Sequence, residues 1–313
     1  MMKVIAFGEA LIDMLALSGE GQRRFLEQPG GAPANVAVGV AKLGGQARFV
    51  GQVGEDMFGD TLVRAMEHYG VDTSALRRTA DALTALAFVS LDDKGERSFA
   101  FYRHGSADLL YRAEHCPADL FSRPVIFHSG SNTLTEPDIH ITTLAMMQKA
   151  READCLVSFD VNYRHNLWTA GANAREPIWD AMAAADIVKL SREELDALYG
   201  NEDKLVRQLL ETGVRLILVT DGGNPLNVHW SGGSTQLKPT NADVTDSTAA
   251  GDAFVAGLLY QLAKQEIGPE TLDRWIEDEA SLGRALDFAC KCGAVAVSRY
   301  GAFDALPYQE EVR

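Results

Sequence analysis

The sequence is poor in the features that mark secreted, membrane-spanning and nucleic-acid-binding proteins. Only 4 of its 313 residues are cysteine, and 29 lysine and arginine residues face 44 aspartate and glutamate residues. The formal net charge of −15 argues against nucleic acid or an anionic membrane surface as a partner. The chain starts in a strand-like segment, without a signal peptide, and holds no apolar run long enough to cross a bilayer. We therefore expect a protein of the reducing cytoplasm.

Several motifs of common enzyme classes are also missing. The seven histidines form neither HExxH nor HxxxH, which disfavours a catalytic zinc. There is no GxSxG of serine hydrolases, and no strand-like run is followed by the GxGxxG of dinucleotide-binding dehydrogenases. Cys290 and Cys292 are spaced too closely for a zinc knuckle and lie in an apolar segment, so we expect buried core thiols.

The remaining sequence alternates strand-like and helix-like segments. This rhythm predicts an α/β protein built on a mostly parallel sheet, with one large domain and a smaller appendage. We expect strands at 4–7, 49–54, 125–130, 156–162, 187–190 and 216–220, and an antiparallel pair at 227–230 and 235–238. We expect helices from 35, at 56–69 and 136–152, from 191 and at 282–297.

Residues 84–103 break the alternation. Two strand-like runs, 84–91 and 97–103, flank the turn-forming residues 92–96 and predict a hairpin outside the main sheet. Residues 14–29 mix polar and apolar side chains without a clear period, which fits edge strands outside the main sheet. The segments of about 14–29 and 84–105 together predict a small β-sheet lid.

The most informative stretch is 244–259, where small residues lie between two acids. If a helix begins here, the backbone N–H groups of Ala249, Ala250 and Gly251 lack intrahelical partners and form a site for a phosphate. Asp252 would lie against that phosphate, where a carboxylate makes sense as a base that takes a proton from an attacking hydroxyl. The alternative is that Asp252 is an ordinary helix N-cap.

A second polar group lies in the N-terminal part of the chain. Asp13 follows the first predicted strand, at the edge where open α/β sheets bind ligands, although turn and cap residues also occur there. Gly30 and Gly31 allow close approach of a ligand. Asn35 opens an Ala- and Val-rich helix, and its amide suits a sugar hydroxyl or serves as a helix cap.

Two widely separated motifs, 30–35 (GGAPAN) and 246–254 (DSTAAGDAF), give the chain a clear resemblance. It resembles the ribokinase-like (PfkB) carbohydrate kinases over essentially its whole length, and within them the bacterial fructokinases through 105–109, 159–168 and 188–195. The resemblance implies one kinase domain, residues 1–313, folded as a three-layer α/β/α sandwich with a β-sheet lid. It also implies ATP-dependent phosphorylation of a sugar hydroxymethyl group, Mg²⁺, a site of the kind that holds K⁺, and a homodimer formed through the lid.

The resemblance also implies roles for individual residues. Asp252 matches the general base, and the anion hole corresponds to Ala249, Ala250 and Gly251. The sugar positions are Asp13, Gly30, Gly31 and Asn35. The nucleotide side corresponds to Thr220, Gly222 and Gly223, with Lys189, Ser191 and Cys290. Glu194 matches a Mg²⁺-linked acid, and the monovalent-cation site corresponds to Asp246 with the carbonyls of Thr248, Ala296 and Gly301.

Three positions depart from the family pattern. Ser191 stands where the motif ending in Glu194 usually begins with Asn, which puts direct help with the metal in doubt. Ala249 replaces the first glycine of the commonest anion hole, a minor change if the donor is a backbone N–H. Cys290 stands where ribokinases tend to have an adenine-side Asn, so we expect adenine to be held by apolar contacts.

The sugar itself is the least determined feature. Fructose is the first expectation, and the alternative is 2-keto-3-deoxygluconate. Tyr102, Arg103 and Arg164 resemble residues of kinases for that acid, where arginines would meet a carboxylate bidentately. These arginines could equally form ion pairs within an acidic protein. A catalytically silent sugar-binding regulator is a further alternative, disfavoured by the intact Asp252 and anion hole.

Overall fold

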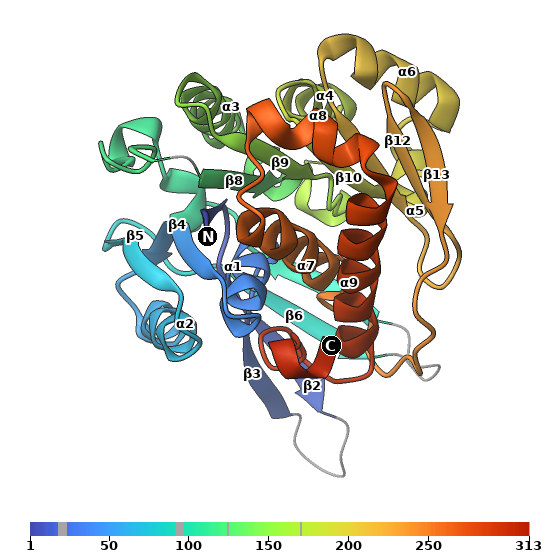
Figure 1. Ribbon diagram of the computed structural model, residues 1–313. Coiled ribbons are helices and arrows are strands. Elements are labelled where there is room, and N and C mark those ends of the chain that lie inside the picture. The colour runs from blue at the N-terminus through green and yellow to red at the C-terminus, as the bar shows by residue number, and fades with distance from the viewer. Residues whose placement is uncertain (18–23, 92–96, 124, 170, 313) are drawn as a thin grey trace.

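A computed structural model describes residues 1–17, 24–91, 97–123, 125–169 and 171–312 (Figure 1). The strands of the main sheet are β1 (Lys3–Phe7), β4 (Gln46–Gly54), β5 (Asp72–Thr79), β8 (Val125–Gly130), β9 (Leu156–Asp160), β10 (Ile187–Ser191), β11 (Leu216–Thr220), β12 (Leu226–Trp230) and β13 (Gly233–Leu237). Over these ranges the sheet has the order β13-β12-β11-β10-β9-β8-β1-β4-β5. It is parallel from β5 to β11, and β12 and β13 extend it antiparallel.

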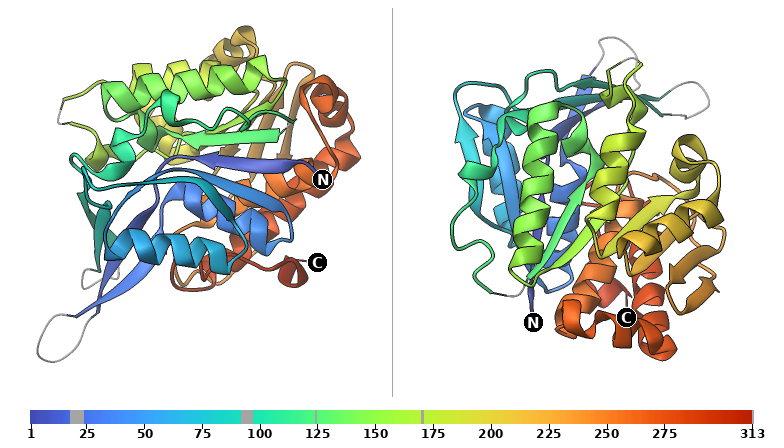
Figure 2. Two further views of the ribbon diagram at one scale, coloured as in Figure 1. Left: turned by 90° about the vertical axis from the view of Figure 1, so that its left-hand side faces the viewer. Right: turned by 90° about the horizontal axis from the view of Figure 1, so that it is seen from above.

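Helices cover both faces of this sheet (Figure 2). They are α1 (Ala32–Lys42), α2 (Met57–His68), α3 (Pro137–Glu152), α4 (Arg175–Ala183), α5 (Arg192–Leu198), α6 (Glu202–Thr212), α7 (Ala250–Lys264), α8 (Pro269–Glu277) and α9 (Glu279–Val297). Short 3₁₀ segments are η1 (Ala107–Leu110), η2 (Ala113–His115), η3 (Ser131–Leu134), η4 (His165–Leu167) and η5 (Gln309–Val312).

Strand β1 shows how the two cores form. Val4 and Ala6 face a core shared with α1, α7, α8 and α9, whereas Ile5 and Phe7 face a core shared with α3, α4 and α6. A strand buried on both faces is a continuous apolar run, as the sequence shows here. The predicted three-layer α/β/α architecture is confirmed.

A second sheet projects from the edge of the main one (Figures 1 and 2). It is formed by β2 (Leu11–Leu17), β3 (Arg24–Gly30), β6 (Leu86–Leu91) and β7 (Arg97–Tyr102), in the order β3-β2-β6-β7. β6 and β7 are the predicted antiparallel hairpin, and β2 and β3 account for the predicted edge strands. The turn at 92–96 and residues 18–23 lie outside the described residues.

The sequence prediction misses helices α4, α6 and α8 and also differs from the structure in two strands. β5 was not expected, because its sequence DTSALRRT lacks an apolar alternation, although Ala75 and Leu76 still pack into the cores. Asp13 was expected in a loop after the first strand but lies within β2, paired with Gln28 of β3. Both strands depend on pairing with distant residues, which local pattern does not encode.

Close crossing of α1 and α7 brings the two sequence motifs together. A Cβ on Gly39 of α1 would lie 2.6 Å from the Cβ of Ala256 of α7, so glycine is what allows this approach. On its other side, α7 packs on α9, where a Cβ on Gly257 would lie 2.8 Å from Sγ of Cys292. Cys290 and Cys292 are buried free thiols, as predicted. No helix within the described ranges is long and apolar enough to cross a bilayer.

Candidate active site

Asp252 lies in the first turn of α7 and is 6% exposed. It is not the helix N-cap, because that position belongs to Ala249, whose φ is +58° and whose side chain makes no capping bond. The capping interpretation of Asp252 is therefore wrong. Its carboxylate is instead held by side chains from two other elements.

Two asparagine amides hold the two oxygens of this carboxylate. Asn35 Nδ2 donates to Asp252 Oδ2 over 2.7 Å, and Asn162 Nδ2 donates to Oδ1 over 3.1 Å. Asn35 does not open its helix, since α1 begins at Ala32 and Asn35 is one turn in. Because a carboxylate accepts and an amide NH₂ donates, this contact fixes the orientation of both amides.

The environment of Asp252 shifts the pKa of its carboxyl group toward neutral pH. Burial raises its pKa to about 6, and the neighbouring Asp160 carboxylate adds to the rise. The Asn35 hydrogen bond and the positive charges of Arg164 and Lys189 act in the opposite direction. A buried carboxyl poised near neutral pH is what a general base requires.

A buried ion pair lies beside the start of α7. Lys189 Nζ lies 3.0 Å from Asp160 Oδ1 and 3.3 Å from Oδ2. Burial alone would lower the pKa of Lys189, but the carboxylates of Asp160, Glu194 and Asp252 raise it. A Cβ on Gly251 would lie only 3.1 Å from Lys189 Nζ. The ammonium therefore lies against the backbone of the predicted anion hole, Ala249, Ala250 and Gly251, at the positive end of the α7 dipole.

A second buried carboxylate lies at the start of α1. Glu9 Oε1 accepts from Ala32 N over 3.2 Å and from Asn132 Nδ2 over 2.9 Å. Burial raises the pKa of Glu9, although the Arg103 charge and the Asn132 bond oppose the rise. Glu9 and Asn132 thereby fix the chain where the Gly30-Gly31 segment enters α1.

Four acceptor atoms in this region are buried without a hydrogen-bond partner in the described part of the chain. They are Asn35 Oδ1, Asn162 Oδ1, Asn132 Oδ1 and Glu9 Oε2. Leaving a buried acceptor unsatisfied costs about 1–3 kcal/mol, so such a group marks a place where a ligand donates. Four acceptors together fit a ligand rich in hydroxyl groups.

The other predicted sugar residues border this group. A Cβ on Gly30 would lie 2.7 Å from Asp13 Oδ2, so the Asp13 carboxylate lies over that glycine. Gly31 has φ +106°, and a Cβ there would lie 2.5 Å from the carbonyl oxygen of Glu9. Both positions require glycine because groups of the protein itself approach closely, and close approach of a ligand there stays a prediction.

Tyr102, Arg103 and Arg164, the residues expected to contact an acidic sugar, lie in different environments. Arg103 is 4% exposed, and its Nε and Nη2 each lie 2.7 Å from Asp108 Oδ2. Asp108 also accepts from Ser106 Oγ over 2.5 Å. Arg164 is exposed and donates to Tyr163 O, while Tyr102 is exposed on β7. The ion-pair alternative therefore describes Arg103.

The predicted nucleotide-side residues other than Cys290 lie at or just beyond the ends of β10 and β11. Ser191 and Thr220 are direct neighbours in the parallel register, and the exposed turn with Gly222 and Gly223 follows β11. Ser191 Oγ accepts from Glu194 N, and Glu194 Oε2 accepts from Ser191 N over 2.7 Å, a reciprocal cap of α5. Cys290 is buried on α9, and burial raises its thiol pKa to about 11.

The predicted cation residues also converge. Asp246 is 3% exposed, its Oδ1 accepts from Thr248 N over 2.8 Å, and its Oδ2 accepts from Gly301 N over 3.1 Å. Ala296 lies at the buried end of α9, one residue before Val297, whose carbonyl accepts from Asp246 N. The Asp246 carboxylate thus connects the segment before α7 with the segment after α9 through hydrogen bonds.

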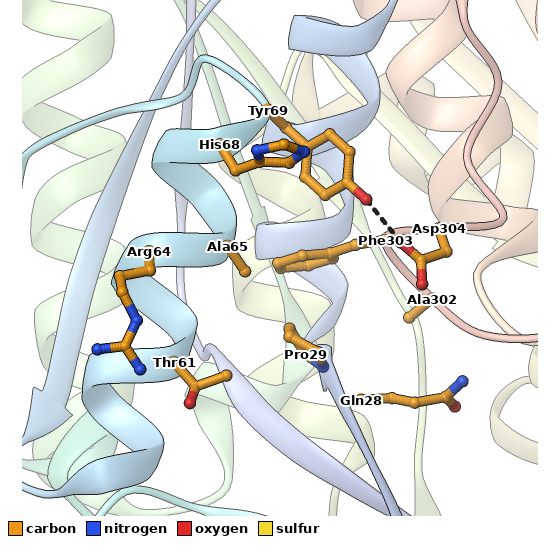
Figure 3. Close-up of a pocket in the computed structure, with 10 residues that line it drawn as sticks. All are labelled: Gln28, Pro29, Thr61, Arg64, Ala65, His68, Tyr69, Ala302, Phe303 and Asp304. Carbon is orange, nitrogen blue, oxygen red and sulfur yellow. Dashed lines mark hydrogen bonds between the residues drawn. The ribbon is translucent and has the colours of Figure 1, made fainter.

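A separate pocket of about 450 Å³ lies beyond Gly30 (Figure 3). Residues from α2, the end of β3 and the C-terminal segment line it, and Tyr69 donates to Asp304 Oδ1 over 2.6 Å. The ten residues drawn in Figure 3 include none of the predicted site residues. Three of its lining residues adjoin predicted site positions: Pro29 and Ala302 are chain neighbours of Gly30 and Gly301, and Gln28 pairs with Asp13 across β2 and β3.

Sequence reasoning left four of the converging side chains without a role: Glu9, Asn132, Asp160 and Asn162. Each lies at or just beyond the carboxyl end of β1, β8 or β9. The rule that open α/β sheets bind ligands at this edge, applied to all strands and not only the first, would have singled them out.

Comparison with known proteins agrees with this geometry. The family model described as "pfkB family carbohydrate kinase" matches residues 1–308. A probable fructokinase-6, chloroplastic, from Arabidopsis thaliana is 41% identical over 99% of this chain and 81% of the relative.

Solved structures are similarly close. The fructokinase with bound ATP from Xylella fastidiosa is 46% identical with a TM-score of 0.95, covering 99% of this chain and 96% of that one. The fructokinase from Vibrio cholerae O395 in fructose, ADP and calcium ion bound form is 32% identical with a TM-score of 0.89, covering 100% and 98%. By its sequence and its fold, the chain belongs to the pfkB family of carbohydrate kinases.

Proposed function

We propose that this carbohydrate kinase transfers the γ-phosphoryl group of ATP to the hydroxymethyl group of fructose, giving fructose 6-phosphate. The carrying observation is the buried Asp252 carboxylate, held by Asn35 and Asn162 and surrounded by unpartnered acceptors. The relatives named above support this choice, since they carry fructokinase names, one of them solved with ATP and another with fructose and ADP.

The same geometry disfavours 2-keto-3-deoxygluconate. Unpartnered carbonyl and carboxylate oxygens attract hydroxyl donors and repel a second carboxylate. The charge of Arg103 is balanced by Asp108 in a buried ion pair, although its Nη2 makes no hydrogen bond in the described part of the chain. Of the two predicted arginines, Arg164 is the one whose side chain is exposed. A neutral polyol therefore fits better than an acid.

The mechanism follows from the position of the base. Asp252 accepts the proton of the attacking hydroxyl as its oxygen approaches phosphorus. The N–H groups of Ala249, Ala250 and Gly251 and the ammonium of Lys189 stabilise the negative charge that spreads over the transferred group. Removing one such donor costs roughly 10²–10³ in kcat at comparable sites.

On the nucleotide side we assign Thr220, Gly222, Gly223, Ser191 and Cys290 to ATP contacts. Thr220 and Ser191 lie at neighbouring strand ends beside the start of α5, and Gly222, with φ +53°, lies in an exposed turn where a Cβ would meet nothing within 4 Å. A Cβ on Gly293, one turn after Cys290, would lie 3.4 Å from the Ala250 carbonyl, so α9 reaches the anion hole. These contacts would place the γ-phosphate beside α7.

A divalent cation fits this donor set as a phosphate-bound ion. Among the described residues, no group of three or more His, Cys, Asp or Glu side chains could hold a metal ion. Mg²⁺ in kinase sites is held by substrate phosphates, waters and one or two carboxylates. Glu194 is the proposed carboxylate, because each of its oxygens accepts one backbone N–H and keeps lone pairs for a water. When bound, Mg²⁺ would neutralise charge on the phosphates.

We assign the monovalent-cation site, with K⁺ as its ion, to Asp246 and the carbonyls of Thr248, Ala296 and Gly301. Oxygen ligands from a buried carboxylate and main-chain carbonyls fit a hard cation. Because the segment that carries Asp246 leads into α7, an ion bound there would stabilise the backbone conformation of the anion hole.

We assign residues 1–313 to a single kinase domain in which the small sheet acts as the lid. Closure of the lid over the sugar would exclude water, which competes as a phosphoryl acceptor. The sheet exposes Leu17, Phe25, Leu26 and Tyr102. A homodimer through the two lids would cover these side chains, and light scattering with a Phe25→Glu variant tests it. The four free cysteines fit a reducing compartment such as the cytoplasm.

The test is a coupled ADP-release assay with purified protein, ATP and Mg²⁺ against fructose, 2-keto-3-deoxygluconate, ribose and adenosine. We expect kcat/KM for fructose to exceed that for the keto acid at least ~100-fold, since an unpaired buried charge costs several kcal/mol. Preferred turnover of the keto acid would overturn the substrate and leave the kinase chemistry. Fructose binding without turnover of any sugar would favour the silent regulator instead.

A further inference from the structure

We propose that Asn162, which the sequence did not assign, is a positioning residue that aims the Asp252 carboxylate and holds it in its charged form. The inference rests on the proposed function, because it concerns the base of the same reaction. Nδ2 of Asn162 lies 3.1 Å from Asp252 Oδ1, across 90 positions of sequence. The opposite oxygen of Asp252, Oδ2, accepts a hydrogen bond from Nδ2 of Asn35. Only the two amides together fix the rotation of the carboxylate.

The backbone of Asn162 is held in an unusual conformation. Its φ is +35°, in the left-handed region that asparagine tolerates better than most residues but that is still unfavourable for a side chain with a Cβ. Two contacts impose this conformation: Asn162 N donates to Asp160 Oδ1 over 3.2 Å, and Ser131 Oγ donates to Asn162 O over 3.4 Å. Asp160 is itself fixed by the ion pair with Lys189.

The side chain has one hydrogen bond among the described residues, and that bond goes to the base. Asn162 is 5% exposed, and its Oδ1 is buried without a partner in the described ranges. A residue kept for stability alone would not combine a strained backbone with an unsatisfied carbonyl. The arrangement makes sense if the function of the amide is to act on Asp252.

The expected effect follows from the charge of the acceptor. A hydrogen bond to a carboxylate favours its charged form and lowers its pKa, so losing this bond raises the pKa of Asp252. The base is active only when it is deprotonated. The acid limb of the activity profile, which is the range where activity falls as the pH is lowered, therefore moves to higher pH. We expect a rise of roughly one pH unit, because a hydrogen bond to a charged group changes an equilibrium constant about tenfold.

The first variant is Asn162→Gly, because glycine keeps φ +35° without strain and removes the amide. We expect kcat to fall roughly 10–100-fold, as for other losses of geometry near reacting atoms. The fructose dissociation constant, measured by calorimetry, should rise less than about tenfold and by less than kcat falls, because Asn162 Oδ1 is only one of the four acceptors open to the sugar. The acid limb of kcat/KM should rise by about one pH unit.

The matched control is Asp154→Gly at the other end of β9. Asp154 has φ +53° and is exposed, so the substitution relieves the same kind of backbone conformation far from the site. We expect wild-type kcat and wild-type pH dependence. Thermal unfolding of both variants shows whether each is folded.

Asn162→Asp keeps the shape and the left-handed conformation but sets a carboxylate against Asp252. Like charges raise the pKa of the base, so the acid limb should rise by more than in Asn162→Gly. Titration of the Asp252 carboxyl by ¹³C NMR, assigned with Asp252→Asn, reads the same change in pKa without any substrate. This readout separates failure of the inference from failure of fructose as the substrate.

Two results would overturn the inference. One is an Asn162→Gly enzyme with wild-type kcat and an unmoved acid limb, which would make Asn162 structural. The other is a loss of kcat matched by an equal loss of fructose binding with an unmoved carboxyl titration, which would make it a sugar contact.

Discussion

Nδ2 of Asn35 donates to Oδ2 of Asp252 over 2.7 Å, although 217 positions separate the two residues. Each belongs to one of the two motifs that carry the family resemblance. The bond exists because α1 and α7 cross at Gly39 and Ala256 with almost no side-chain volume between them. The proposed base and Asn35 therefore lie on two helices in direct contact, an arrangement that would position a reacting hydroxyl without flexible loops.

The first prediction concerns pH. Burial raises the pKa of Asp252 to about 6, and only the deprotonated carboxylate accepts a proton. The value of kcat/KM for fructose should therefore fall about tenfold per pH unit below about pH 6 and level off above it. A pH profile at saturating ATP measures this. An acid limb near pH 4, the value of an ordinary exposed carboxyl, would contradict the buried-base assignment.

The second prediction concerns Gly31, whose φ is +106°. In Gly31→Ala, the new Cβ would meet the Glu9 carbonyl at 2.5 Å and displace the entry to α1, so we expect fructose KM to rise at least ~10-fold. Gly44→Ala is the matched control. Gly44, just beyond the other end of α1, has φ +85°, and the nearest atom to a Cβ there is 3.8 Å away. Its substitution should cost stability with unchanged KM, and equal KM effects in both variants would contradict the account.

The third prediction concerns the buried pair of Arg103 and Asp108. In Asp108→Asn or Arg103→Gln, one partner is left buried and charged, so each should lose about 3–5 kcal/mol of unfolding free energy. The double variant should lose less than the sum, because no uncompensated charge remains. Urea unfolding of all four proteins gives the coupling energy. Additive losses would show that the two charges act independently.

The fourth prediction concerns Ala249, which departs from the usual glycine. The substitution was expected to be minor because the donor is a backbone N–H, but the structure places Ala249 at φ +58°, where a Cβ costs about 1–2 kcal/mol. Ala249→Gly should therefore raise the free energy of unfolding by about 1 kcal/mol, measured in urea. Ala253→Gly, inside the same helix, should lower it by about 1 kcal/mol. A destabilising Ala249→Gly would show that the position carries no strain.

Alternating strand-like and helix-like segments predicted an α/β protein on a mostly parallel sheet, and a hairpin turn predicted the separate small sheet. Small residues at a helix start predicted the phosphate site beside Asp252. The three-layer sandwich was implied by the family resemblance. Asp252 was recognisable because an acid beside a phosphate site has few structural uses.

The rest depended on contacts between distant residues. Asn162 was visible only as a polar residue after a strand, since its role requires the positive φ and the proximity of Asp252. Arg103 was left open between a contact to an acidic sugar and an ion pair, because sequence gives no sign that its side chain turns back to Asp108. The start of α1 at Ala32 excludes the helix cap, one of the two roles expected of Asn35, and its amide donates instead to Asp252.

The central claim, that Asp252 is the base of a sugar kinase, is tested most directly by Asp252→Asn. This variant removes the proton acceptor and keeps the shape of the side chain. We predict that turnover with fructose and ATP falls at least ~10²–10⁴-fold. Fructose binding, measured by calorimetry on the same protein, should remain within about tenfold of wild type, because the asparagine amide keeps the shape and most of the contacts of the site. Turnover of the variant at the wild-type rate would contradict the account.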